Sequence, residues 1–179
     1  LADLASFTDW FTIEYQTKNA PWFVFGGSYP GALASWYRTA YPDHSAGSLS
    51  SSGVTNCIID YYGFDQQVSA AIGNSCSDQI KRINKAYEEK VSTTEGWSEV
   101  LSSFNCESDM WKEDFFYMIA DSWSMADQYS QKDSLCNAIE AVGEDASDEE
   151  LMTTFSNWSN SFWGSDFCSG GFYNTEQLA

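Results

Sequence analysis

The sequence predicts an α/β fold that passes, further along the chain, into an all-helical part. Up to about residue 55, segments with helical apolar spacing alternate with short apolar runs, which is typical of a parallel sheet with crossover helices. From about residue 75 onward the strand signals vanish, and apolar residues recur at the spacing of one helix face. We therefore divide the chain into a partial α/β core (1–55), a connection (56–74) and a helical subdomain (75–179).

The first part of the chain predicts helix, strand, helix and strand in that order. "LADLASFTDWFTIEY" (1–15) has helical apolar spacing, and "WFVFGG" (22–27) is a short continuous apolar run. "ALASWYRTAY" (32–41) reads as a helix that stops before Pro42, because proline cannot continue it. "SAGSLSSSG" (45–53) is then a second strand, whose small side chains indicate tight packing.

The second part of the chain shows only helical periodicity. Apolar residues share one face in each of four segments, 76–91, 96–104, 114–123 and 134–142. The last long helix is expected to begin at Ser147, whose hydroxyl can cap it while Glu150 reaches back in a capping box. A helical subdomain follows from this pattern.

Charge and hydropathy exclude several classes of partner. With 26 acidic and 8 basic side chains the net charge is −18, which makes phosphate-backbone binding and hence a nucleic-acid partner improbable. No apolar run approaches the roughly 18 residues of a membrane span. The acidic run "EDASDEE" lacks the spacing of a calcium loop, so neither a metal nor a cofactor is expected. The acidity fits an acidic compartment or the exterior, although it can equally serve solubility alone.

Five widely spaced cysteines indicate disulfides and an oxidising compartment, because they form no CxxC pair of the zinc or thioredoxin type. The alternative is five reduced cysteines in a cytosolic protein. The cysteines are Cys57, Cys76, Cys106, Cys136 and Cys168. An odd number leaves one of them without an intramolecular partner, and Asn157 in "NWS" is a glycosylation candidate that weakly supports secretion.

The segment "GGSYPG" (26–31) is the strongest chemical signal, since it places a serine between glycines, as Gly-x-Ser-x-x-Gly, directly after an apolar strand and directly before a helix, which is the context of a nucleophile elbow. In that context Ser28 is expected to adopt a strained backbone conformation at a sharp turn and to act as a nucleophile. Glycines on either side let chain segments approach closely, and the backbone N–H of Tyr29 would be one oxyanion-hole donor. The alternative is a glycine-rich turn with an inert serine.

A serine nucleophile needs a histidine and a carboxylate, and the sequence holds one histidine. His44 follows the helix that begins after Ser28, so a helical rise of roughly 1.5 Å per residue puts it near the far end of that helix. We therefore interpret His44 as a surface or packing residue and expect the triad acid and histidine outside this chain.

The stretch "PWFVFGGSYPGALASWYRTAYPDHSAGSLSSSG" (21–53) resembles the nucleophile segment of the family that includes lysosomal Pro-Xaa carboxypeptidase, dipeptidyl peptidase II and thymus-specific serine protease. "LADLASF", "DYYGFDQQV" and "FWGSDFCSGGFYNT" resemble further segments of the family, so the likeness covers nearly the whole chain. It implies an α/β-hydrolase core with an inserted helical cap, and serine peptidases that release short pieces from a chain end beside proline in acidic vesicles or outside the cell.

The resemblance also implies site residues and pairings. Ser28 matches the family nucleophile. The substrate-pocket candidates are Ala32, where relatives often carry a bulkier residue such as Met, and Trp163 and Phe167, whose segment departs from the family's polar pattern. The implied disulfides are Cys76 with Cys136 and Cys57 with Cys168, which leaves Cys106 over.

Two strands cannot complete a hydrolase sheet, so we expect this chain alone to be an incomplete fold. Its expected partners are the remainder of the same hydrolase and a peptide substrate. A homodimer is an open alternative for the oligomeric state. The leading hypothesis for function is a serine exopeptidase that acts through an acyl-enzyme on Ser28. The alternatives are a non-catalytic relative that serves as a binding module, and an esterase or lipase of the same fold. The expected location is lysosomal, another acidic vesicle, or secreted.

Overall fold

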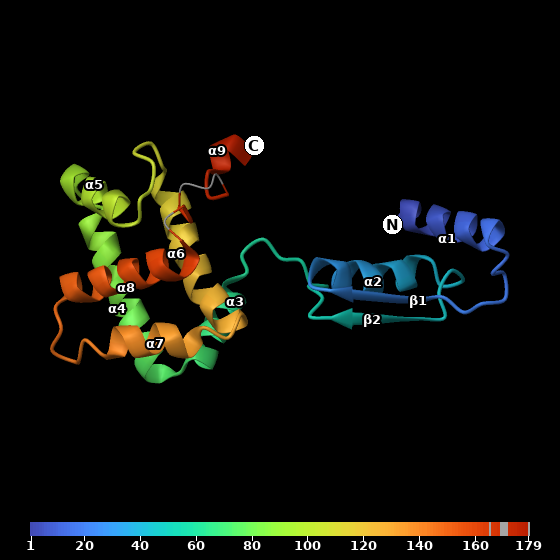
Figure 1. Cartoon of the computed structure of the whole chain (residues 1–179), viewed down its shortest axis with the longest axis horizontal. Helices are drawn as coiled ribbons and strands as arrows, with labels where there is room; N and C mark the ends of the chain where they lie inside the picture. The colour runs from blue at the N-terminus through green and yellow to red at the C-terminus, as the bar shows by residue number, and fades with distance from the viewer. Residues whose placement is uncertain (165, 169–171, 179) are drawn as a thin grey trace. The chain divides into compact units, whose positions relative to one another are not determined.

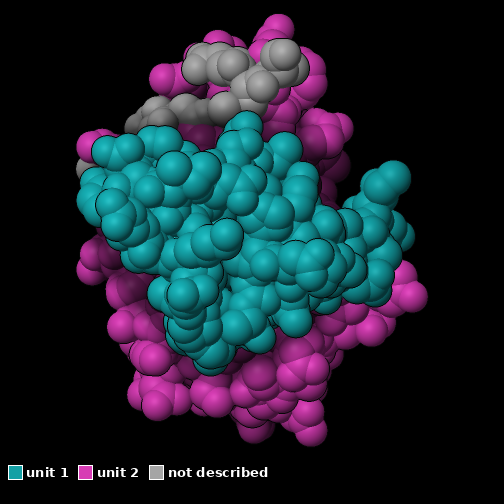
Figure 2. Space-filling model, turned by 90° about the vertical axis from the view of Figure 1, so that its right-hand side faces the viewer, with its two compact units in different colours: residues 1–60 teal, residues 61–179 magenta. Residues whose placement is uncertain are grey.

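The computed structural model describes residues 1–164, 166–168 and 172–178, and these form two compact units, residues 1–60 and 61–179 (Figures 1 and 2). The first unit holds both strands, and in the second unit the described residues form helices, turns and loops without a strand. The predicted change from α/β to all-helical structure is therefore present in the chain. None of the helices formed by the described residues has the length and apolar character that crossing a membrane requires.

The first unit consists of α1 (Ala2–Glu14), β1 (Phe23–Gly27), α2 (Tyr29–Ala40) and β2 (Gly47–Ser51), which confirms the predicted order helix, strand, helix, strand (Figure 1). β1 and β2 pair in parallel, and each residue of one strand faces the residue 24 positions away in the other, from Phe23 and Gly47 to Gly27 and Ser51. The α2 crossover is what allows two consecutive strands to run in the same direction.

One face of this sheet is covered by α2 and the other is open. Val24 and Gly26 are half-buried, whereas Phe23 and Phe25 are 58% and 71% exposed. Side chains alternate between the two faces along a strand, so both phenylalanines lie on the face away from α2. Leu49 lies opposite Phe25 in the parallel register and is 52% exposed. The open face is thus apolar.

The second unit contains seven helices among the described residues. Their bounds are α3 (Tyr62–Ile72), α4 (Asn74–Lys90), α5 (Thr94–Ser103), α6 (Lys112–Gln128), α7 (Lys132–Glu140), α8 (Asp148–Trp163) and α9 (Thr175–Leu178). α3 lies within the segment that the sequence suggests as a connection. It forms a helix because Phe64, Val68 and Ile72 recur every four residues and pack into the core of this unit.

Aromatic side chains form the centre of the helical unit. Tyr87, Phe104, Phe115 and Phe155 are buried and contact one another with ring centroids 5.4 to 6.3 Å apart. Trp123 stacks on Phe155 at 3.7 Å. The buried hydroxyl of Tyr87 donates to the carbonyl oxygen of Met152 at 2.9 Å, and burial raises the pKa of that hydroxyl well above its usual range.

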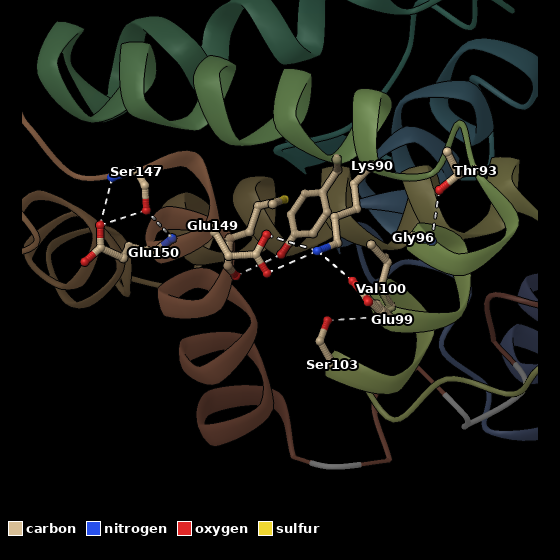
Figure 3. Close-up of polar contacts among 11 residues, drawn as sticks. Lys90, Thr93, Gly96, Glu99, Val100, Ser103, Ser147, Glu149 and Glu150 are labelled. Atoms are coloured by element: carbon tan, nitrogen blue, oxygen red, sulfur yellow. Dashed lines mark hydrogen bonds and ion pairs between the residues drawn. The ribbon is translucent and has the colours of Figure 1, made fainter.

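Polar contacts fix the ends of these helices (Figure 3). Ser147 caps α8, and its backbone N–H donates to Glu150 Oε2 at 2.8 Å while its Oγ accepts from the Glu150 N–H at 3.3 Å. The predicted capping box is confirmed. Thr93 caps α5 by accepting from the Gly96 N–H at 3.0 Å.

Two disulfides join distant parts of the helical unit. Cys76 pairs with Cys136, as the resemblance implies, and links α4 to α7. The expected pair of Cys57 with Cys168 is wrong, because Cys168 pairs with Cys106, whose Cα lies 5.0 Å away. Cys57 is free and exposed. Cys106 and Cys168 follow α5 and α8, and the packing of these helices brings the ends together.

Candidate active site

Ser28 stands between β1 and α2 with φ +58° and ψ −127°. A non-glycine residue rarely adopts a positive φ, and this combination lies outside the left-handed helical region as well. The surrounding contacts hold it there, since the Ser28 N–H donates to Ser51 O at 2.9 Å and Ser28 O accepts from the Ala32 N–H at 3.2 Å. The strained turn expected from the motif is present, and it leaves the Ser28 side chain exposed.

The glycines around Ser28 are required by close approach of the backbone. A Cβ on Gly26 would lie 1.9 Å from Pro30 O, and one on Gly31 would lie 2.8 Å from Ser51 O. Gly53 completes this contact, because its Cβ would lie 2.7 Å from the carbonyl carbon of Gly31. The motif predicts the first two glycines. Gly53 could have been found from the "SSG" that ends the second strand segment.

Ser28 is also the residue from which α2 begins. The first N–H groups of a helix have no partner within it, and Tyr29 occupies the first position, followed by Pro30, which has no N–H. The free donor and the positive end of the helix dipole therefore lie next to Ser28 in the chain. Such an arrangement favours negative charge next to Ser28, which is what acyl transfer needs.

His44 does not belong to this arrangement. Its Nε2 lies 3.1 Å from Oδ1 of Asp9, and its ring contacts Tyr41 edge-on with centroids 5.5 Å apart. His44 follows the carboxyl end of α2, whereas Ser28 precedes its amino end. Twelve residues of helix separate the two ends, which is roughly 18 Å. His44 and Asp9 thus form a histidine–carboxylate pair at the end of α2 away from Ser28, and no local sequence pattern predicts the Asp9 contact.

The pocket candidates lie in different surroundings. Ala32 is buried within the first unit. Trp163 and Phe167 stack on each other in the second unit at 5.2 Å, and Trp163 Nε1 donates to Ser122 Oγ at 2.9 Å. The structure therefore brings Trp163 and Phe167 together within the helical unit.

The carboxyl group of Asp121 lies near this aromatic pair, and the sequence does not predict a role for it. Phe167 contacts the ring of Tyr173 at 5.2 Å, and the Tyr173 hydroxyl donates to Asp121 Oδ2 at 3.2 Å. Burial raises the pKa of Asp121 above its ordinary value, despite the opposing effect of the Tyr173 hydrogen bond. Asp121 lies on a helix among many acidic residues, so nothing local distinguishes it.

The helical unit also has a cavity of about 520 Å³ beside α3, α4 and α6. Its walls include Val68, Ile80 and Trp123, and Trp123 Nε1 donates to Asn84 Oδ1 at 3.2 Å on its lining. No group of three or more metal-ligating side chains is arranged to hold an ion among the described residues.

Comparison with known proteins gives a consistent picture. Residues 1–163 match the family described as serine carboxypeptidase S28. The chain is 34% identical over 176 residues to an Arabidopsis thaliana protein named "Probable serine protease EDA2", covering 92% of this chain and 35% of that protein. It is 34% identical over 56 residues to human thymus-specific serine protease, covering 31% of this chain and 11% of that protein.

A third relative is an Arthroderma benhamiae protein named "Probable extracellular serine carboxypeptidase". The two are 40% identical over 53 residues, which cover 30% of this chain and 7% of that protein. The chain therefore spans about a third or less of the length of these relatives. No solved structure matches it significantly.

Proposed function

Because the chain belongs to the serine carboxypeptidase S28 family, we propose that it carries the nucleophile of a serine peptidase that removes short pieces from one end of a peptide. Ser28 attacks the peptide carbonyl and forms an acyl-enzyme, which water then hydrolyses. The Tyr29 N–H binds the developing oxyanion. A histidine outside this chain accepts the serine proton and gives it to the amine that leaves as the peptide C–N bond breaks, and an aspartate outside this chain orients that histidine.

One observation carries this proposal: the φ of +58° and ψ of −127° at Ser28, at a junction of strand and helix. Strain of this kind persists only where the surroundings impose it, and it is concentrated at functional sites. Gly26 and Gly31 allow the backbone contacts that impose it. An inert turn would have no need of a serine in this conformation, since glycine adopts a positive φ without strain.

The two units have separate roles in this proposal. Residues 1–60 are part of an α/β-hydrolase core, and residues 61–179 are its helical cap. The open apolar face formed by Phe23, Phe25 and Leu49 supports an incomplete core, because burial of such side chains is worth about 2 kcal/mol each. The remaining strands and helices of the same hydrolase are the partner that would cover it.

Substrate and location are further parts of the proposal. The substrates are peptides trimmed at one end, with a preference for cleavage beside proline that Ala32 relaxes by widening the pocket. Trp163 and Phe167 contribute to substrate binding from the cap. The enzyme works in the lysosome, in another acidic vesicle or outside the cell, which the two disulfides and the name of the Arthroderma relative support. Asn157 is exposed on α8 and remains a glycosylation candidate.

A fluorophosphonate probe on the whole protein tests the nucleophile. We expect one adduct at Ser28, located by peptide mass spectrometry, and none after Ser28→Ala. Ser52 supplies a matched control, since it is also an exposed serine with positive φ, at +50°, but it does not precede a helix. Ser52→Ala should label normally. Absence of the Ser28 adduct in the native protein would rule out both the peptidase and an esterase, and would leave a binding module.

If the probe labels Ser28, assays on the unlabelled native protein then distinguish an exopeptidase from an esterase. Peptides that end in Pro-Xaa and peptides that begin with Xaa-Pro are compared at acidic pH with a simple ester. Cleavage of either peptide class supports the exopeptidase and identifies the trimmed end. Hydrolysis of the ester alone would contradict it.

A further inference from the structure

All the basic side chains of residues 1–60 line a single cavity. Lys18, Arg38 and His44 are the only lysine, arginine and histidine of this segment, and each of them borders a cavity of about 580 Å³ next to α1 and α2. The whole chain carries a net charge of −18. These three side chains thus gather at one cavity of a very acidic protein, and two of them, Lys18 and Arg38, are cations.

The same cavity holds buried hydroxyl groups without a partner. Ser45 is 5% exposed and lines the cavity, and its Oγ makes no hydrogen bond to any described group. The Oγ1 of Thr17, also on the lining, is shielded from solvent and unpartnered as well. Leaving a buried hydroxyl without a partner costs about 1 to 3 kcal/mol, and a ligand or water that hydrogen-bonds to the hydroxyl removes that cost.

Two acidic residues, Asp9 and Asp43, also lie on the lining, and among the described residues neither forms an ion pair with Lys18 or Arg38. Asp9 is occupied by His44, with 3.1 Å between its Oδ1 and His44 Nε2. Asp43 is exposed. Arg38 donates to the carbonyl oxygen of Pro42, which fixes its guanidinium at the cavity but leaves its charge uncompensated. Lys18 has no ion pair with another described residue.

This cavity is separate from Ser28. Trp22 and Ala46 line it and directly precede β1 and β2, whereas Ser28 follows the other end of β1. Five strand residues at about 3.3 Å each separate the two ends by roughly 15 Å. A ligand in the cavity therefore does not reach the nucleophile.

We propose that this cavity binds a small oxyanion between Lys18, Arg38 and the hydroxyls of Ser45 and Thr17. The cations supply charge, and the hydroxyls donate hydrogen bonds to the remaining oxygens. Phosphate, sulfate or a carboxylate shares this chemistry. Bound oxyanion joins the loop before β1 to the loop before β2, and so stabilises the sheet from the end opposite Ser28.

Titration of the whole protein with inorganic phosphate tests the proposal, at constant ionic strength maintained with sodium chloride. Binding is followed by calorimetry and by ³¹P line broadening. We expect one site, and a loss of about tenfold in affinity for Lys18→Gln, because a charge-assisted hydrogen bond is removed. Ser45→Ala should weaken binding several-fold. Lys85→Gln is the matched control, since Lys85 is exposed on α4 and its one ion pair with a described residue is that with Glu89.

Acetate provides a second arm of the experiment. Tighter binding of phosphate than of acetate assigns the site to phosphate or sulfate groups, and equal binding assigns it to carboxylates; either result supports an oxyanion site if Lys18→Gln weakens it. The proposal is overturned if neither anion binds, or if Lys18→Gln and Lys85→Gln bind phosphate equally. Ser28 labelling is unaffected by either outcome, so the proposed peptidase function stands or falls separately.

Discussion

The backbone N–H of Ser28 donates a 2.9 Å hydrogen bond to the carbonyl oxygen of Ser51, the last residue of β2. This bond continues the parallel ladder one step beyond the end of β1. It fixes the strained residue to the neighbouring strand, while the start of α2 packs against the same carbonyl through Gly31. The conformation of Ser28 is therefore set by contacts on two sides, and changes at those contacts should disturb it.

We expect Gly26→Ala to destabilise the protein by about 3 kcal/mol and to abolish fluorophosphonate labelling of Ser28. The new Cβ would lie 1.9 Å from Pro30 O, and a backbone atom cannot move aside as a flexible side chain can. Urea unfolding and probe labelling measure the two effects. Gly27→Ala is the control, because its Cβ would come no closer than 4.0 Å to Ser51 O. Equal loss in both variants would contradict the role of close approach.

The elements around Ser28 could be predicted because their signals are local. Each signal lies within a few residues of the feature it predicts, as with the apolar run before Ser28 and the glycines beside it. The capping box at Ser147, in the helical unit, is an equally local signal. The partner of Cys168 was not predictable in this way. Pairing depends on which helix ends meet in space, and the spacing of cysteines along the chain carries no such information. The contact of His44 with Asp9 depends in the same way on the packing of α1 against the end of α2.

The corrected disulfide predicts different behaviour for three cysteines. In the native protein we expect iodoacetamide to modify Cys57, which is free and exposed, and to leave Cys106 and Cys168 unmodified. Cys106→Ser should lower the free energy of unfolding by about 4 kcal/mol, as the chain-entropy model gives for a loop of roughly 60 residues. Cys57→Ser should have no such effect. Peptide mapping that finds Cys57 linked to Cys168 would contradict the Cys106–Cys168 disulfide and support the pairing that the family resemblance implies.

The capping box predicts a loss of stability at acidic pH. Hydrogen bonds from the Ser147 backbone N–H and hydroxyl lower the pKa of Glu150 below its ordinary 4.5. A lowered pKa means that this contribution is present above pH 4.5 and is lost as the pH falls through the folded-state value. Urea unfolding of Glu150→Gln should therefore show a deficit at neutral pH that shrinks as the pH falls below 4.5.

Two variants control this prediction. Glu88 is exposed on α4, so Glu88→Gln should match the wild type across the same range. Ser147→Ala removes the cap itself and should cost about 1 kcal/mol at neutral pH. A Glu150→Gln deficit that grows on acidification would show that the carboxylate is not acting as described.

The ion pairs of Lys90 predict a loss of stability at alkaline pH, which is the opposite pH dependence. Its Nζ lies 2.7 Å from Glu99 Oε2 and 3.0 Å from Glu149 Oε2, and so joins α4, α5 and α8 (Figure 3). The hydrogen bond with Glu99, followed by that with Glu149, raises the pKa of Lys90 above 10.5.

Because this pKa is raised, the stability that Lys90 contributes is fully present below pH 10.5. It is lost only as the pH rises through the folded-state pKa. Both glutamates are more than half exposed, so solvent screens the pair and Lys90→Met should cost only about 1 kcal/mol. We expect this deficit in urea unfolding to stay level from roughly pH 6 to 9 and to shrink at higher pH. Lys85→Met, whose 3.8 Å pair with Glu89 lies on the surface, should cost less than about 0.5 kcal/mol throughout. A Lys90→Met deficit no larger than that of Lys85→Met would mean that bridging three helices adds nothing beyond an ordinary surface pair.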